Sequence, residues 1–162
     1  MDAFELNLSC PHGLGQVCEW VNAVSKIPVW AKTTPNITHI EDPSRAALLA
    51  GCEGISAINT IRSVMGVDLD TLRPEPTVEG YTTPGGYSRK AVKPIALRMV
   101  MEIAQLIRKD FPGRSLSAIG GVETGRDDVQ FILLGGDTIQ VCQGRLRVCL
   151  RLHLSSWLHP LR

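Results

Sequence analysis

Aromatic side chains, unbalanced charge and long apolar runs are all scarce in this sequence. Only 5% of the 162 residues are aromatic, so a core would consist mainly of Leu, Ile, Val and Ala. The formal net charge is +1 with scattered Lys and Arg, so we expect no nucleic-acid and no membrane partner. No apolar run approaches the roughly 18 residues of a membrane span, and the N-terminus lacks the basic start of a signal peptide.

The cysteines form no metal-ligand or disulfide pattern. The five of them are widely spaced and include no C-x-x-C pair: Cys10, Cys18, Cys52, Cys142 and Cys149. Neither zinc nor an iron–sulfur cluster therefore has a ligand set, and we predict no metal site. An odd number of unpatterned thiols favours a reducing compartment, so we expect the cytosol, or a plastid if a parent chain carries a transit peptide.

Short apolar runs alternate with helical patterns along most of the chain. Strands are predicted at residues 4–9, 29–32, 54–58, 116–119 and 138–142. The intervening helices carry terminal signals at Asp42 with Pro43, at Gly51, at Pro94, and at Thr124 with Gly135. This alternation indicates βαβ units and a parallel α/β sheet. Five strands and four helices are too few for a closed (β/α)₈ barrel, so the chain is an open sheet or part of a barrel.

Two stretches break the alternation. Residues 60–93 are rich in Pro, Gly, Thr and Tyr, and a loop of this length in a compact domain is functional or disordered as a rule. Residues 144–162 contain four arginines, two histidines and no acid, with alternating apolar residues where a helix is expected. We divide the chain into a partial barrel over residues 1–143 and an atypical basic tail over residues 144–162.

Polar residues gather where the predicted strands end. The five strands end in turn at Asn7 to Cys10, at Lys32, at Asn59 and Thr60, at Gly120 and Gly121, and at Cys142 and Gln143. In parallel α/β folds these ends meet at one edge of the sheet, where binding sites lie. Each residue also has a plain structural reading: a buried cysteine, a lysine extending to solvent, a turn-forming asparagine, or a tight glycine turn.

An ordered set of motifs resembles the FMN-binding barrels of the dihydroorotate and dihydropyrimidine dehydrogenases. The set consists of ELNLSCPHG from Glu5, WAKTTPN from Trp30, AINT from Ala57, IGGV from Ile119 and QVC from Gln140. The segments LRPEP from Leu72 and VEGYTTPGGYS from Val78 are similar to plant-type dihydropyrimidine dehydrogenases. The resemblance covers residues 4–143 and implies the last five strands of a (β/α)₈ barrel.

The resemblance implies a function and a cofactor. The function is FMN-dependent reduction of uracil and thymine to 5,6-dihydropyrimidines, with NADPH as electron donor. The FAD, NADPH and iron–sulfur sites of the full family are not in this chain. A homodimer of a longer parent chain is one assembly that the resemblance allows. Dihydroorotate dehydrogenase is the alternative activity, and a non-catalytic truncated fragment is the alternative from a different class.

The resemblance also assigns roles to particular residues. Cys10 would be the general acid, because a thiol of ordinary pKa, about 8.5, is protonated at neutral pH. Four residues would bind the pyrimidine: Asn7, Ser9, Asn59 and Thr60. Lys32 would contact FMN, since a cation on a buried strand needs a partner. The flavin phosphate would lie against Gly120, Gly121, Val122, Cys142 and Gln143.

The sequence also departs from the family pattern. His12 replaces the Asn of orotate-using relatives, which favours a substrate without a carboxylate. The loop after Cys10 is shorter than in relatives, where it closes over the substrate. Arg89 replaces a Gly that many relatives place beside the flavin. With three strands missing, we expect the chain alone to bind FMN weakly or not at all.

Overall fold

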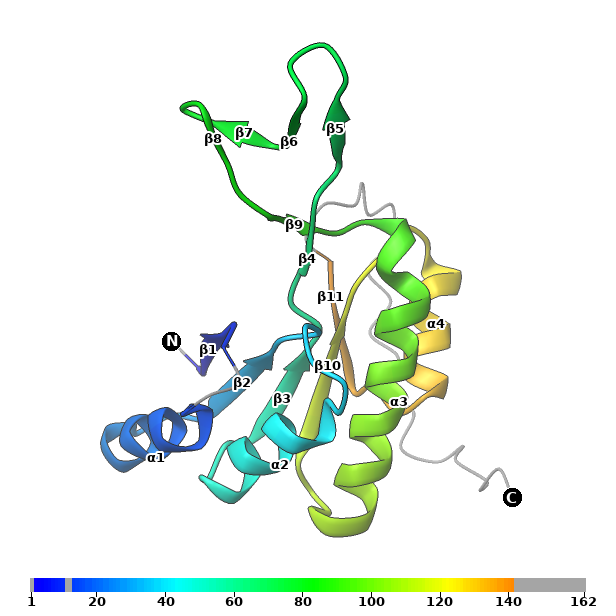
Figure 1. Cartoon of the computed structure of the whole chain (residues 1–162). Helices are drawn as coiled ribbons and strands as arrows, with labels where there is room; N and C mark the ends of the chain where they lie inside the picture. Colours follow the sequence, from blue (N-terminus) through cyan, green and yellow to red (C-terminus); the bar gives the residue numbers. More distant parts are fainter. Residues whose placement is uncertain (1, 11–12, 142–162) are drawn as a thin grey trace.

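The protein is described by a computed structural model that places residues 2–10 and 13–141. Its centre is one parallel sheet of five strands in the order β1-β2-β3-β10-β11 (Figure 1). The strands are β1 (Phe4–Leu8), β2 (Val29–Thr33), β3 (Gly54–Ala57), β10 (Ser115–Ile119) and β11 (Thr138–Gln140). All five predicted strands are confirmed, with ends that shift by one or two residues. The predictions for residues 142–162 and for His12 lie outside the described residues.

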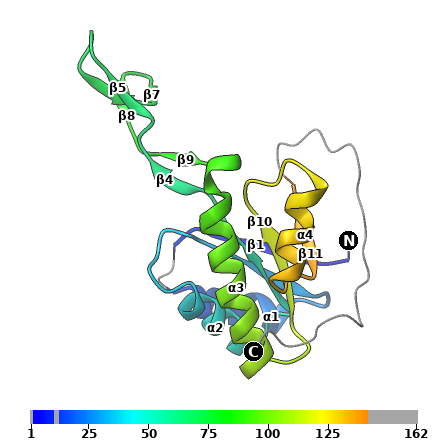
Figure 2. The ribbon, with the colours of Figure 1, turned by 90° about the vertical axis from the view of Figure 1, so that its right-hand side faces the viewer.

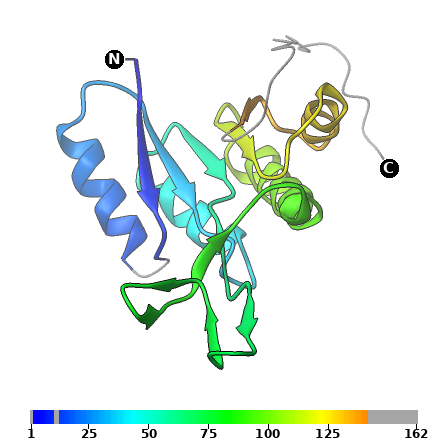
Figure 3. The same ribbon diagram turned by 90° about the horizontal axis from the view of Figure 1, so that it is seen from above.

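The α-helices of the described residues lie along one side of this sheet (Figure 3). They are α1 (Leu14–Val24), α2 (Glu41–Leu49), α3 (Lys93–Asp110) and α4 (Gly125–Leu133). Successive helices pack against each other, α1 on α2, α2 on α3 and α3 on α4. A single helical layer on one face is the arrangement of a barrel wall, whereas a doubly wound sheet carries helices on both faces. No helix in the described part of the chain is long and apolar enough to cross a bilayer.

The local signals placed most helix ends correctly. Thr124 caps α4 with a capping box that includes Asp127, and a proline lies in the first turn of α3. The prediction that Asp42 caps α2 is wrong, because the helix begins at Glu41 with the buried Ile40 at the N-cap. Asp42 lies instead in the first turn, where its charge suits the positive end of the helix dipole.

The two faces of the sheet differ in polarity because strand residues alternate between them. On β2, Val29, Ala31 and Thr33 are fully buried beneath the helices. Trp30 and Lys32 lie half-buried on the opposite, concave face. A strand places every second side chain on the same face, so one pattern supplies both an apolar core and a polar interior surface.

Residues 60–93 are not an irregular loop, which corrects the expectation from composition. They form three two-stranded antiparallel ribbons and one 3₁₀ helix, η1 (Lys90–Val92). The ribbons pair β4 (Ile61–Ser63) with β9 (Gly85–Tyr87), β5 (Gly66–Asp68) with β6 (Arg73–Glu75), and β7 (Thr77–Val78) with β8 (Tyr81–Thr82). We call β5 to β8 the arm, because it stands away from the sheet and helices (Figures 1 and 2).

Candidate functional site

Polar side chains form a row across the concave face because the strand register aligns them. Asn7 on β1 pairs in register with Lys32 on β2, and Lys32 pairs with Ser56 on β3. Ser56 pairs in turn with Ser117 on β10. Parallel strands in register place these residues side by side, so the row follows from the sequence alternation once the strand order is known.

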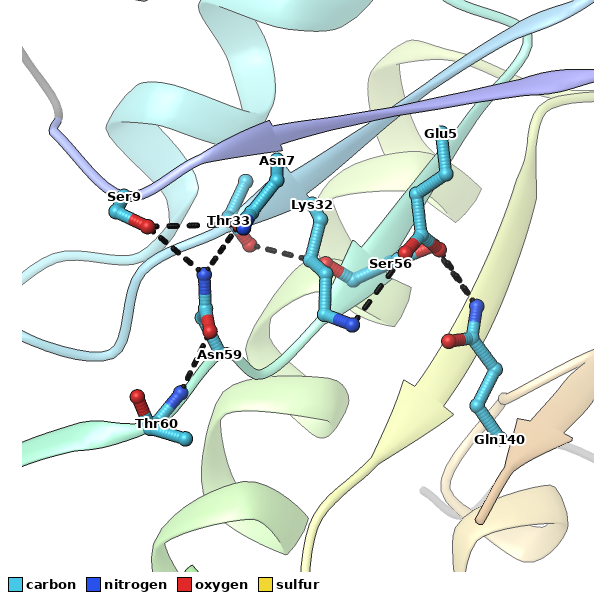
Figure 4. Close-up of polar contacts among 9 residues, drawn as sticks. All are labelled: Glu5, Asn7, Ser9, Lys32, Thr33, Ser56, Asn59, Thr60 and Gln140. Carbon is cyan, nitrogen blue, oxygen red and sulfur yellow. Dashed lines mark hydrogen bonds and ion pairs between the residues drawn. The ribbon is translucent and has the colours of Figure 1, made fainter. Parts of the chain in front are cut away.

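Three of the predicted substrate residues meet at one end of this row (Figure 4). The Asn59 side-chain amide donates to Asn7 Oδ1 at 2.6 Å and to Ser9 Oγ at 3.1 Å. Asn59 Oδ1 accepts the backbone N–H of Thr60 at 2.9 Å, the turn-type bond that its position after a strand suggested. The Asn59 side chain both shapes the turn after β3 and reaches β1. A turn-forming role for Asn59 is therefore compatible with a role in substrate binding.

The carboxylate of Glu5 lies at the centre of the concave face. No role was predicted for it from the sequence. Glu5 Oε2 accepts from Ser56 Oγ and from Gln140 Nε2, both at 2.6 Å, and Glu5 Oε1 lies 3.3 Å from Lys32 Nζ (Figure 4). Partial burial would raise the pKa of Glu5, but the bonds from Gln140 and Ser56 and the charge of Lys32 outweigh it and lower the pKa. Glu5 is thus an ionised partner for Lys32 within the chain.

These polar side chains on the concave face, which we call the polar layer, border a pocket of about 400 Å³. This volume is within the usual range for small-molecule sites. The described lining of the pocket includes six predicted site residues: Lys32, Asn59, Thr60, Gly120, Gly121 and Val122. Ile58, Val92 and Ile119 supply apolar wall. Asn7, Ser9 and Cys10 are not among the described lining residues, and Asn59 links the pocket to the first two.

The glycine pair after β10 forms the turn at the other end of the pocket. Gly120 and Gly121 have φ of 134° and 71°, and a Cβ on either would lie 2.7 Å from a side-chain carbon of α3. Backbone conformation and close packing thus both require glycine here, in agreement with the prediction of a tight glycine turn. Both glycines also line the pocket, and their role in binding a phosphate stays a prediction.

The first turn of α4 already holds an anion of the protein itself. Asp127 Oδ2 accepts the backbone N–H groups of Glu123 at 3.1 Å and Thr124 at 2.8 Å, and Asp127 Oδ1 pairs with Lys93. Burial would raise the pKa of Asp127, but Lys93 and these donors reverse that and hold the pKa well below its usual range. The turn at Gly120–Gly121, rather than the first turn of α4, is therefore the candidate phosphate cradle.

Arg89 lines the same pocket with a strained backbone. Its φ is 71° and its ψ is −164°, a region that glycine adopts and side chains avoid. The structure gives a physical reason for a glycine at this position, and the arginine adds a side chain at the edge of the pocket.

We expect Arg89→Gly to raise the free energy of unfolding of the chain by about 1 kcal/mol, measured by urea denaturation. The substitution relieves about 1–3 kcal/mol of strain and costs about 0.5–1 kcal/mol of backbone entropy. Lys90→Gly is the matched control, because Lys90 lies in η1 with no positive φ and should lose stability. A fall in stability for Arg89→Gly would show that contacts of its side chain outweigh the strain.

Cys10 is exposed and follows directly after Ser9 at the end of β1. It therefore lies at the edge of the sheet that carries the Asn7–Ser9–Asn59 cluster, as the strand-end pattern predicts. The reading of Cys10 as a buried structural cysteine is wrong. That description fits Cys18 and Cys52 instead, which are fully buried. Cys142 and Gln143 lie outside the described residues.

Comparison with known sequences gives one consistent family. A model described as Dihydroorotate dehydrogenase matches residues 1–146. The chain is 58% identical to chloroplastic dihydropyrimidine dehydrogenase (NADP(+)) of Arabidopsis thaliana, covering 89% of the chain and 38% of that protein. It is 40% identical to the NAD-dependent dihydropyrimidine dehydrogenase subunit PreA of Escherichia coli K12, covering 88% and 38%. It is 41% identical to the catalytic subunit of dihydroorotate dehydrogenase B (NAD(+)) of Pyrococcus abyssi, covering 86% and 48%.

A solved structure extends the likeness to the fold. Dihydroorotate dehydrogenase of Eimeria tenella, in complex with ferulenol, superposes with a TM-score of 0.61 at 22% identity, covering 87% of this chain and 44% of that one. The predicted fold class, part of a (β/α)₈ barrel with a parallel sheet, is confirmed. The chain spans less than half the length of each of these four proteins.

Proposed function

The chain belongs to the dihydroorotate dehydrogenase family, and on that premise we propose that it supplies the pyrimidine-reducing half of an FMN-dependent dihydropyrimidine dehydrogenase. The reaction is the reduction of uracil or thymine to the 5,6-dihydro form, with NADPH as electron donor, in pyrimidine catabolism. The 58% identity to the Arabidopsis dihydropyrimidine dehydrogenase, against 41% to the Pyrococcus dihydroorotate dehydrogenase, favours uracil and thymine over orotate.

The residues around the pocket fit a flavin mononucleotide. An apolar wall, a cation at Lys32 and the glycine turn at Gly120–Gly121 that lines the pocket would suit a flat ring, its polar edge and a phosphate respectively. When bound, FMN would supply a hydride to pyrimidine C6. Lys32 would place positive charge at the polar edge of the ring, held there by its pair with Glu5. Cys142 and Gln143, beyond the described residues, remain proposed phosphate contacts.

The chain's own residues would bind the pyrimidine and move one proton. Asn7 and Asn59 can each donate and accept, which matches the alternating carbonyl and N–H edge of uracil. Ser9 and Thr60 would add hydroxyl groups beside them. Cys10 would hold a proton on Sγ and deliver it to C5, which balances the hydride received at C6. The product is the 5,6-dihydropyrimidine, in which the C5–C6 bond is saturated.

The convergence of Asn7, Ser9 and Asn59 from two distant strands carries this proposal. A chimera tests it, with residues 4–141 of this chain replacing the matched stretch of the Arabidopsis relative and with that relative's loop after Cys10 retained. We expect NADPH oxidation that depends on uracil or thymine. Turnover of dihydroorotate in place of uracil would support the alternative activity. A folded, flavin-loaded chimera inert toward both would support the non-catalytic hypothesis.

Compartment and assembly remain part of the proposal. The Arabidopsis relative is chloroplastic by name, which favours the plastid over the cytosol for a parent of this chain. We retain a homodimer of a longer parent as the proposed assembly, and the division at residue 143 between barrel and basic tail as the proposed domain boundary.

A further inference from the structure

Residues 33–36, which we call the platform, form the end of β2 and the start of the loop that follows it. Thr33, Thr34 and Pro35 are buried, which limits the movement of this segment. Asn36 is exposed but is bonded to the platform twice, because its backbone N–H and its Nδ2 both donate to Thr34 Oγ1, at 3.2 and 2.9 Å. These two bonds fix the orientation of the Asn36 side-chain amide.

The Asn36 side chain reaches from the platform to the turn after β3. Its Nδ2 donates to Thr60 O at 3.1 Å, and its Oδ1 accepts the backbone N–H of Arg62 at 2.7 Å. The backbone N–H of Asn59 donates to Thr33 O at 3.0 Å. Two consecutive predicted substrate residues, Asn59 and Thr60, are therefore each hydrogen-bonded to the platform.

The side chain of Thr60 packs against a glycine of the neighbouring ribbon. Gly86 on β9 pairs in register with Arg62 on β4, and a Cβ on Gly86 would lie 2.5 Å from Thr60 Oγ1 and 2.9 Å from Thr60 Cβ. Rotation of the Thr60 side chain does not move its Cβ, so a side chain at position 86 would displace one of the two backbones. Gly86 has no positive φ, so close packing, and not backbone conformation, requires glycine here.

We infer that Asn36 and Gly86 are positioning residues for the pyrimidine site, because together they fix the place of Thr60. Thr60 and Gly86 both line the pocket. Asn36 holds the Thr60 main chain by a hydrogen bond, and Gly86 leaves the room that the Thr60 side chain occupies. The inference rests on the proposed function for what Thr60 binds, whereas the hold on Thr60 needs neither flavin nor pyrimidine.

Amide hydrogen exchange of the full 162-residue chain, without flavin or substrate, tests the hold on the turn. Asn36→Ala should accelerate exchange of the Arg62 amide, because it removes the acceptor at 2.7 Å. Asn36→Asp should preserve that protection, because a carboxylate oxygen still accepts, but it replaces the donor to Thr60 O with a second acceptor. Thr38→Ala is the matched control, because Thr38 is exposed in the same loop, and it should leave exchange at Arg62 unchanged.

The uracil dissociation constant of the flavin-loaded chimera, measured by titration of the flavin absorbance, tests the consequence for the site. Asn36→Ala and Asn36→Asp should both weaken uracil binding by about 3–10-fold, the factor that one typical hydrogen bond represents. Gly86→Ala should weaken it at least about tenfold, because small displacements of a positioned group are costly. Gly85→Ala is the matched control on the same strand, since its Cβ would make an ordinary contact of 3.4 Å with Pro76, and it should leave uracil binding unchanged.

Urea unfolding of the flavin-free variants separates positioning from stability. If Asn36 and Gly86 only stabilise the fold, their variants should lose stability while the folded enzyme keeps its uracil dissociation constant, and that result would overturn the inference. Unchanged exchange at Arg62 in Asn36→Ala would overturn it as well. Failure of the parent chimera to bind uracil would refute the proposed function instead. The inference would then reduce to the hold on the turn, which exchange at Arg62 decides by itself.

Discussion

Cys10→Ala in the chimeric barrel is expected to lower uracil turnover by about 10²–10⁴-fold, the range that a general acid typically contributes. FMN content and uracil affinity should change little, because Cys10 is exposed at the strand end and is not among the described residues that line the pocket. The measurement is steady-state NADPH oxidation over a range of uracil concentrations, which separates turnover from affinity.

Two controls separate proton delivery from general damage to the site. Cys10→Ser should be similarly impaired at neutral pH, because a hydroxyl releases its proton far less readily than a thiol. Both variants should still allow NADPH to reduce the bound flavin, since that step does not use the Cys10 proton. A Cys10→Ala chimera that reduces uracil within a few-fold of the parent rate would remove Cys10 from the mechanism.

The sheet and its helices could be predicted because their signals are local. Short runs of apolar residues, in β2 alternating between buried and half-buried positions, mark the strands, and capping residues such as Thr124 mark helix starts within a few positions. Residues 60–93 were misread because Gly, Pro and Thr favour tight antiparallel ribbons as well as irregular loops. Composition alone does not separate these two structures.

For the site, the sequence predicted which residues lie at the strand ends on one edge of the sheet, but not which side chains they contact. Asn7, Ser9 and Asn59 could be grouped because the ends of parallel strands converge. Glu5 could not be placed as the centre of the polar layer, because its contact with Gln140 joins positions 135 residues apart. Two signals were available: Glu5 shares a strand face with Asn7, and Lys32 needed a counter-charge.

Lys32 either contacts FMN or serves only as the structural ion-pair partner of Glu5. Substitutions at Lys32 and at Glu5 separate these two roles. If Lys32 contacts FMN, Lys32→Ala in the chimera should weaken FMN binding by about 10–100-fold, since hydrogen bonds to charged groups contribute about 1.5–3 kcal/mol. Glu5→Gln should leave FMN binding unchanged or tighter, because it removes the negative charge that competes for the ammonium while its amide oxygen still accepts from Ser56 or Gln140.

Flavin-fluorescence titration gives the dissociation constants, and urea unfolding of the flavin-free proteins gives the stabilities. The cofactor account expects the two variants to differ strongly in FMN binding. If Lys32 is only a structural partner, both variants should lose stability, because each leaves one member of a half-buried ion pair without its counter-charge. Lost stability in both variants with unchanged FMN affinity would therefore assign Lys32 to the sheet rather than to the flavin.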